Sequence, residues 1–191
     1  MARDRIYTRT GDDGTTGLFY GGRVRKDSEH PTAYGTVDEV QAVLGLARAT
    51  SDDAELSELV LVLERDLWVV MAELATKPAN RAKLKPGTSL VTVEMVERLE
   101  RTIDDLDSRF APPTEFVVPG EALAGAWLDL ARTVARRAER DALAVAGPPS
   151  HVGVYLNRLS DLLWTMARWQ ESRSGPSRPS RSIVNPEEQQ Q

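Results

Sequence analysis

The feature that most constrains the fold of this chain is the recurrence of apolar side chains at steps of three and four residues. Val37, Val40, Leu44 and Ala47 follow this spacing, and comparable runs return in four later segments. Such spacing places apolar side chains on one face of an α-helix, and that face packs against other helices. Only a short piece, 115–118, has the composition of a strand. We therefore predict an all-α fold, a five-helix bundle in a single domain.

The ends of these helices are predicted from capping residues and helix breakers. Thr36 and Glu39 have the spacing of a capping box at or near the start of the first helix. Thr92 is the predicted N-cap of the third helix. The stretch 77–90, which holds two prolines and a glycine, is predicted to be a loop. The second, fourth and fifth helices are predicted over the ranges 53–76, 122–146 and 151–172.

The helical domain is predicted over residues 1–172, and a tail over 173–191 follows it. The tail consists largely of Ser, Arg, Pro, Glu and Gln, a composition that cannot build a core. The N-terminus has no apolar run of the kind that a secretory signal needs. No stretch approaches the roughly 18 apolar residues of a membrane span. We therefore expect a cytoplasmic protein with no membrane segment.

Composition also excludes several classes of function. The chain of 191 residues has no cysteine, which excludes disulfides, thiolate zinc sites and cysteine nucleophiles. Its two histidines are too few for a histidine-built metal site. The sequence does not identify the ligands of any metal ion that binds. The net charge of -5 and the lack of a basic patch interleaved with aromatics argue against a partner made of nucleic acid.

The first polar segment of interest is rich in glycine and threonine. It reads TRTGDDGTTG at 8–17 and is followed by Lys26. Successive glycine and hydroxyl residues expose backbone N–H groups, which is how loops bind phosphates. The segment lacks the Gly-Lys-Ser/Thr ending of a P-loop. A solvated N-terminal arm is the alternative interpretation, and composition alone favours it.

The second polar segment carries a stripe of arginines. Arg132, Arg136 and Arg140 are spaced by four residues, so they share one face of the predicted helix, with Glu139 beside Arg136. Like charges at this spacing repel one another, so an anionic partner is expected there, either a phosphate chain or carboxylates of another subunit. A solvated charged face that nearby acids compensate is the alternative.

Two further positions are candidates for a functional role. Asn157 is a mediocre helix former near the start of a strong helix and shares a face with Asp161, which favours a hydrogen-bonding role. A simple cap or surface position is the alternative. Phe116 precedes a Pro-Gly turn and lies on no helical stripe, so it can project into a pocket. The alternative for Phe116 is a buried structural side chain.

Together these segments resemble the PduO-type ATP:cob(I)alamin adenosyltransferase family. The motifs occur in the family's order and at its separations, and the resemblance covers about residues 6–170. Five motifs in order make a specific signal, although any one of them could arise by chance. The motifs are IYTRTGDDGTTGL at 6–18, AYGTVDEV at 33–40, FVVPG at 116–120, ARTVARRAER at 131–140 and YLNRLSDLLWTMAR at 155–168.

The resemblance implies a homotrimer with active sites between neighbouring subunits, which use ATP, Mg²⁺ and cobalamin. Arg132 corresponds to the family's arginine that pairs across the subunit boundary with an aspartate, matched here by Asp38. Phe116 corresponds to the phenylalanine that displaces the lower axial ligand of cobalamin. The nucleotide-binding residues implied by the resemblance are Thr8, Arg9, Thr10, Gly11, Thr16, Gly17, Lys26, Arg136, Arg137, Ala138, Glu139, Arg140 and Asn157.

The implied reaction moves the 5′-deoxyadenosyl group of ATP to the cobalt of cob(I)alamin, with release of triphosphate. A cobalamin reductase and an adenosylcobalamin-dependent enzyme are the further partners that this reaction implies. The chain departs from the family pattern at Glu121, where a second glycine usually follows Pro-Gly. A non-enzymatic carrier of cobalamin or nucleotide, built on the same bundle, is the alternative.

Overall fold

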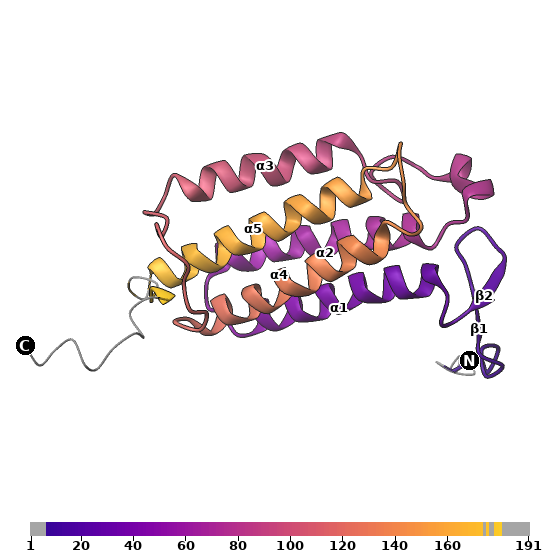
Figure 1. Cartoon of the computed structure of the whole chain (residues 1–191), viewed down its shortest axis with the longest axis horizontal. Coiled ribbons are helices and arrows are strands. Elements are labelled where there is room, and N and C mark those ends of the chain that lie inside the picture. Colours follow the sequence, from indigo (N-terminus) through magenta and orange to yellow (C-terminus); the bar gives the residue numbers. More distant parts are fainter. Residues whose placement is uncertain (1–6, 174, 176–177, 181–191) are drawn as a thin grey trace, which may run out of the picture.

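The computed structural model of the chain describes residues 7–173, 175 and 178–180, and within this part five long α-helices form one bundle (Figure 1). A two-stranded sheet lies at one end of the bundle, together with a 3₁₀ helix. The predicted all-α, five-helix architecture is confirmed. In chain order the elements are β1 (Thr15–Gly17), β2 (Arg23–Arg25), α1 (Glu29–Ala49), α2 (Ala54–Leu74), η1 (Pro78–Lys83), α3 (Val93–Asp107), α4 (Leu123–Ala142) and α5 (Val152–Ser172).

Helix α4 packs against both α1 and α5, while α2 packs against α1 and α3 against α5. The buried face of α4 is built from small residues, since Ala131, Ala135 and Ala138 are all fully buried. Small side chains at a contact allow helix axes to approach closely. Larger side chains such as Leu44 of α1 and Leu159 of α5, also fully buried, belong to the same core. The core therefore follows the apolar stripes of the sequence.

The predicted capping box at Thr36 and Glu39 is wrong, because α1 begins about two turns earlier, after Ser28. Thr36 lies inside the helix. Its Oγ1 lies 3.0 Å from the Thr32 carbonyl oxygen, one turn earlier, and 2.7 Å from Asp141 Oδ2 of α4, and the hydroxyl can donate to either. The first turns of α1 are ordered by packing, since Ala33 is fully buried. This contact with the rest of the bundle is not visible in the local sequence.

Other predicted boundaries hold in part. The loop prediction over 77–90 is wrong for Pro78–Lys83, which form η1. Helix α4 ends at Ala142 rather than at 146, although the next residues continue in hydrogen-bonded turns. The N-cap at Thr92 is confirmed, because its Oγ1 accepts a hydrogen bond from the Met95 N–H at 3.4 Å.

The glycine-rich N-terminal segment is more regular than predicted. Thr15–Gly17 and Arg23–Arg25 pair as antiparallel strands, with Thr15 opposite Arg25 and Gly17 opposite Arg23. The segment between the strands turns through Tyr20, Gly21 and Gly22, which all have positive φ. Glycine adopts this conformation without steric cost, so the turn is encoded locally.

The strand-like piece before α4 pairs with the described part of the tail. Val118 N–H donates to the Arg178 carbonyl oxygen at 2.9 Å, and Ser180 N–H donates to the Phe116 carbonyl oxygen at 2.7 Å. Glu121, the departure from the family pattern, forms an ion pair with Arg178 at 3.0 Å. Residues 1–6 and the rest of the predicted tail, including 181–191, lie outside the described residues.

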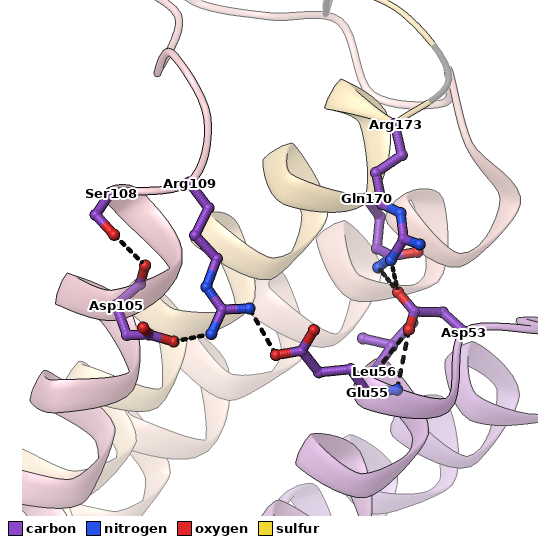
Figure 2. Close-up of polar contacts among 8 residues, drawn as sticks. All are labelled: Asp53, Glu55, Leu56, Asp105, Ser108, Arg109, Gln170 and Arg173. Carbon is purple, nitrogen blue, oxygen red and sulfur yellow. Dashed lines mark hydrogen bonds and ion pairs between the residues drawn. The ribbon is translucent and has the colours of Figure 1, made fainter.

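A polar clamp joins α2, α3 and α5 at one end of the bundle (Figure 2). Asp53, the N-cap of α2, accepts hydrogen bonds from two backbone N–H groups of the first turn, from Gln170 Nε2 at 2.7 Å and from Arg173. Arg109, just past α3, pairs with Glu55 of α2 at 2.6 Å. Partial burial acts to raise the pKa of Asp53, but the hydrogen bonds and the charge of Arg173 together hold it below its ordinary value. The clamp fixes the bundle end from which the α3–α4 connection leaves.

None of the helices in the described part of the chain combines the length and apolar character that crossing a membrane requires.

Candidate functional site

The N-terminal segment forms a polar hollow of about 340 Å³ next to the β1–β2 sheet. Most of its wall comes from the residues predicted to bind nucleotide, with threonine hydroxyls, glycine backbone and two basic side chains. Paired strands give this segment a fixed shape, which a solvated arm would lack. The hollow is lined by Tyr7, Thr8, Arg9, Thr10, Gly11, Asp12, Thr15, Thr16, Gly17, Arg23 and Lys26.

Lys26 and Gly11 lie against each other in this hollow. A Cβ atom added to Gly11 would lie 3.2 Å from Lys26 Nζ and 2.9 Å from the Thr15 carbonyl oxygen. The backbone N–H of Lys26 donates to the Gly14 carbonyl oxygen at 2.9 Å, which fixes the lysine beside the loop. The ammonium group therefore lies beside the half-buried Gly11 backbone, and a cation next to a glycine-rich loop suits phosphate oxygens.

Arg23, which the sequence analysis did not select, braces this loop. Its Nε donates to Thr15 Oγ1 at 3.0 Å, and its Nη2 donates to the Thr10 carbonyl oxygen at 2.5 Å. Asp13 accepts from the Thr15 hydroxyl at 2.7 Å, and this hydrogen bond is the main cause of the lowered pKa of Asp13. One arginine thus connects β2 to both sides of the predicted phosphate loop.

The turn between β1 and β2 is tied to the C-terminal end of α2. Phe19 N–H donates to the Ala75 carbonyl oxygen at 2.9 Å. Asn80 Nδ2, in η1, donates to the Tyr20 carbonyl oxygen at 3.3 Å. These bonds attach the loop to the bundle end at which β1 and β2 are drawn in Figure 1.

The arginine stripe of α4 is exposed and only partly compensated within the chain. Arg136 and Arg140 are exposed, and Arg140 Nη1 donates to the Arg136 carbonyl oxygen at 2.8 Å. In the part of the chain that the structure describes, no ion pair involves either side chain. Arg132 pairs with Asp129, and the neighbouring Arg137 pairs with Glu39 of α1, so these two arginines fit the compensated-face alternative.

Asn157 joins this group from α5, because its Nδ2 donates to Glu139 Oε1 at 3.2 Å. The pair links the two helices that carry the predicted far side of the nucleotide site. Ala138 is fully buried in the core, so its side chain does not reach this surface. Asp161, in contrast, is exposed and pairs with Arg158 at 3.1 Å.

A second and larger cavity, of about 780 Å³, lies beneath the segment that precedes α4. Phe116 lines it and is 90% exposed, so it is not a buried structural side chain in the chain described here. Arg132 lies on the same wall, and its Nε donates to Asp129 Oδ1 at 3.2 Å. The lining residues are Pro113, Thr114, Glu115, Phe116, Val117, Pro119, Asp129, Arg132, Trp164, Arg168 and Ser180.

The two hollows do not form one site within a single chain. Figure 1 shows β1 and β2 at one end of the bundle and the connection from α3 to α4 at the other end. Asp38, the predicted partner of Arg132, is exposed on α1, and within the described residues no ion pair involves it. The predicted loop residues thus line one hollow, and Phe116 and Arg132 line the other. The remaining predicted residues line neither hollow: Asp38, Arg136, Arg137, Ala138, Glu139, Arg140 and Asn157.

Among the described residues, no group of three or more His, Asp or Glu side chains has the arrangement to hold a metal ion.

A family model described as "Cobalamin adenosyltransferase" matches residues 6–170 of this chain. The chain belongs to the cobalamin adenosyltransferase family. The resemblance inferred from the five motifs is confirmed, over the same span of the sequence.

Named relatives and solved structures agree with this membership. The chain is 42% identical over 171 residues to a corrinoid adenosyltransferase of Citrobacter freundii, with 88% of this chain and 96% of the relative covered. It is 39% identical over 170 residues to the corrinoid adenosyltransferase PduO of Salmonella typhimurium, of whose length it spans 50%. Its fold matches a variant PduO-type ATP:corrinoid adenosyltransferase from Lactobacillus reuteri complexed with cobalamin and ATP, with a TM-score of 0.83, 26% identity, and coverage of 93% of this chain and 97% of that chain.

The cobalamin adenosyltransferase fold brings to the two hollows several residues that the sequence analysis missed. Arg23 braces the loop, while Asp129 and Arg168 line the larger cavity. The sequence pattern could have indicated Arg168, since it is a charged residue next to Trp169 within the apolar stripe of α5. Asp129 follows Leu128 on α4 in the same way. A charge embedded in an apolar stripe indicates a buried ion pair, and both residues are in fact buried.

Proposed function

We propose that this chain transfers the 5′-deoxyadenosyl group of ATP to the cobalt of cob(I)alamin, releasing triphosphate and forming adenosylcobalamin. The observation that carries the proposal is the N-terminal hollow, in which Lys26 Nζ lies beside the Gly11 backbone and threonine side chains line the same wall. This hollow has the chemistry of a polyphosphate site, and it is built largely from the family motif at 6–18.

The reaction explains why the site has basic and small residues and needs no protein nucleophile. The electron pair on cobalt of cob(I)alamin forms the bond to the ribose C5′ atom, and the C5′–O bond breaks with its electron pair on the triphosphate. Negative charge therefore grows on the leaving phosphate chain. Lys26, Arg136 and Arg140 would stabilise that charge, and a rigid hollow would hold the ribose in line with the cobalt. Mg²⁺ would enter with ATP, bound through phosphate oxygens and water.

The active unit is proposed to be a homotrimer with each site shared between chains. The loop hollow and the Phe116 cavity lie at different parts of one chain, so a second copy has to bring its hollow to the cavity of the first. Asp38 is exposed and available to pair with Arg132 of a neighbouring copy. Sedimentation or mass photometry at micromolar concentration is expected to show a trimer, and a monomer alone would contradict this assembly.

Phe116 is proposed to act on cobalamin rather than on ATP. Its ring is exposed on a non-helical segment and lines the larger cavity, where it can displace the lower axial ligand of bound cobalamin. Removal of that ligand makes the cobalt easier to reduce. A cytoplasmic location, a cobalamin reductase as electron donor and an adenosylcobalamin-dependent enzyme as recipient complete the proposal.

The deciding experiment is anaerobic incubation of the protein with chemically reduced cobalamin and MgATP. Appearance of the adenosylcobalamin spectrum, together with one triphosphate released per corrinoid, is the expected result. Tight binding of both substrates without product would instead identify a carrier and overturn the proposed reaction.

A further inference from the structure

A buried ion cluster lies behind Arg132 on the wall of the larger cavity. Arg168 of α5 is only 1% exposed, and its guanidinium pairs with Asp129 of α4 and with Glu171, at 3.0 Å in the latter case. Asp129 is 4% exposed and uses both carboxylate oxygens, Oδ2 for Arg168 and Oδ1 for the Nε of Arg132. Asp129 thus bridges a fully buried arginine and an arginine of the proposed site.

Stability alone does not account for this cluster. Burial of an arginine and two carboxylates carries a desolvation cost that their attraction barely offsets, and well-packed apolar side chains would serve a helical core at least as well. The cluster also lies on the wall of a cavity, since Asp129, Arg132 and Arg168 all line it. A buried charge network that ends at a functional surface fixes the orientation of the group at its end.

The hydrogen-bond pattern shows which part of Arg132 is fixed and which part is left available. Asp129 engages Nε, the nitrogen nearest the chain, at 3.2 Å. Within the described part of the chain, the two Nη groups of Arg132 make no hydrogen bond. Since a guanidinium is planar, holding Nε fixes the plane in which both Nη groups point. Trp164 completes this wall, with the Arg168 guanidinium 6.0 Å from its ring centroid.

We propose that Asp129 and Arg168 are positioning residues that hold the Arg132 guanidinium in one orientation for its work at the boundary with a second copy of this chain. Arg168 anchors Asp129, and Asp129 orients Arg132, whose Nη groups then face Asp38 of that second copy at the corrinoid side of the site. The inference rests on the proposed function, in which the cavity lined by Phe116 binds cob(I)alamin. Asp129, Arg132 and Arg168 line that same cavity, so they are assigned to the binding of cob(I)alamin rather than of ATP.

The test is Asp129→Asn, with Asp66→Asn as its matched control. Asp66 is also a buried aspartate of the bundle, 8% exposed, and it accepts from Arg98 Nη2 at 2.5 Å and from the Tyr155 hydroxyl at 3.1 Å. It lines neither hollow. Both substitutions keep the shape of the side chain and remove one buried charge, so both are expected to lower the melting temperature.

The kinetics are expected to separate the two variants. Asp129→Asn should raise the KM for cob(I)alamin about tenfold, the size of one lost charge-assisted hydrogen bond, and leave the KM for ATP within about twofold. Asp66→Asn should change neither KM. If Asp129→Asn does not fold, Arg168→Lys takes its place, because it keeps the charge but loses the forked geometry.

A double-mutant cycle decides whether Asp129 acts through Arg132. In an Arg132→Ala background, Asp129→Asn should cause no further rise in the KM for cob(I)alamin. Fully additive effects, or equal kinetics for Asp129→Asn and Asp66→Asn, would overturn the inference while leaving the proposed reaction intact. Absence of adenosylcobalamin formation by the wild-type protein would instead refute the reaction itself.

Discussion

Truncation of Phe116 separates cobalt chemistry from protein stability. The ring is 90% exposed, so about a tenth of its surface is removed from water within the chain. Full burial of such a side chain contributes roughly 1.5–3 kcal/mol, and a tenth of that is about 0.2–0.3 kcal/mol. For a chain of this size, such a change shifts the melting temperature by about 1 °C. Phe116→Ala should therefore fold like the wild-type protein and bind ATP with unchanged affinity.

The effect of Phe116→Ala is expected in the cobalamin instead. With cob(II)alamin and ATP bound, the four-coordinate cobalt signal seen by electron paramagnetic resonance should shrink sharply, and turnover should fall with it. Leu143→Ala is a suitable control, because Leu143 is 68% exposed and lines neither hollow. A Phe116→Ala protein with a large drop in melting temperature and an undiminished four-coordinate signal would show that the ring only packs, in that case against another subunit.

Three further predictions concern ATP and pH. Arg136→Ala should raise the KM for ATP at least tenfold through the loss of charge-assisted bonds to phosphate, with an unchanged helical circular-dichroism signal; unchanged kinetics would make the stripe a solvated face. Gly11→Ala should weaken ATP binding in calorimetry, since its Cβ would lie 3.2 Å from Lys26 Nζ, whereas Gly147→Ala, with open space around its Cβ, should not. The folded-state pKa of Asp53 is lowered, so its stabilising effect is present above the ordinary pKa of 3.8 and is lost as pH falls through the lowered value. The melting-temperature gap between wild type and Asp53→Asn should accordingly close on acidification; a gap that stays constant would contradict the role of the charge.

The sequence by itself determined the helices and the family. Apolar periodicity is a local property, so the runs that include Leu44 and Leu159 identified core faces that the structure confirms as buried. The Thr92 N-cap was also readable, because a cap depends on a bond between residues three apart. The five motifs identified the family before any contact between helices was known.

Tertiary structure decided where the first helix begins and how the N-terminal segment is shaped. The residues before Thr36 become helical because Ala33 is buried by other helices, a contact that no window of sequence contains. Arg23 reaches Thr10 across the β1–β2 pairing, so its role depends on the register of two strands. Local patterns carry neither kind of information.

The larger cavity also depends on tertiary packing that local sequence patterns do not contain. Asp129 and Arg168 are 39 positions apart and meet only because α4 and α5 pack side by side in one register. The pairing of Phe116 and Val118 with residues 178–180 likewise joins segments about sixty positions apart. Sequence fixes which faces are apolar, since hydrophobic burial follows residue type. The distance between two charged groups on different helices is set by how side chains interlock across the core, which only the folded chain defines.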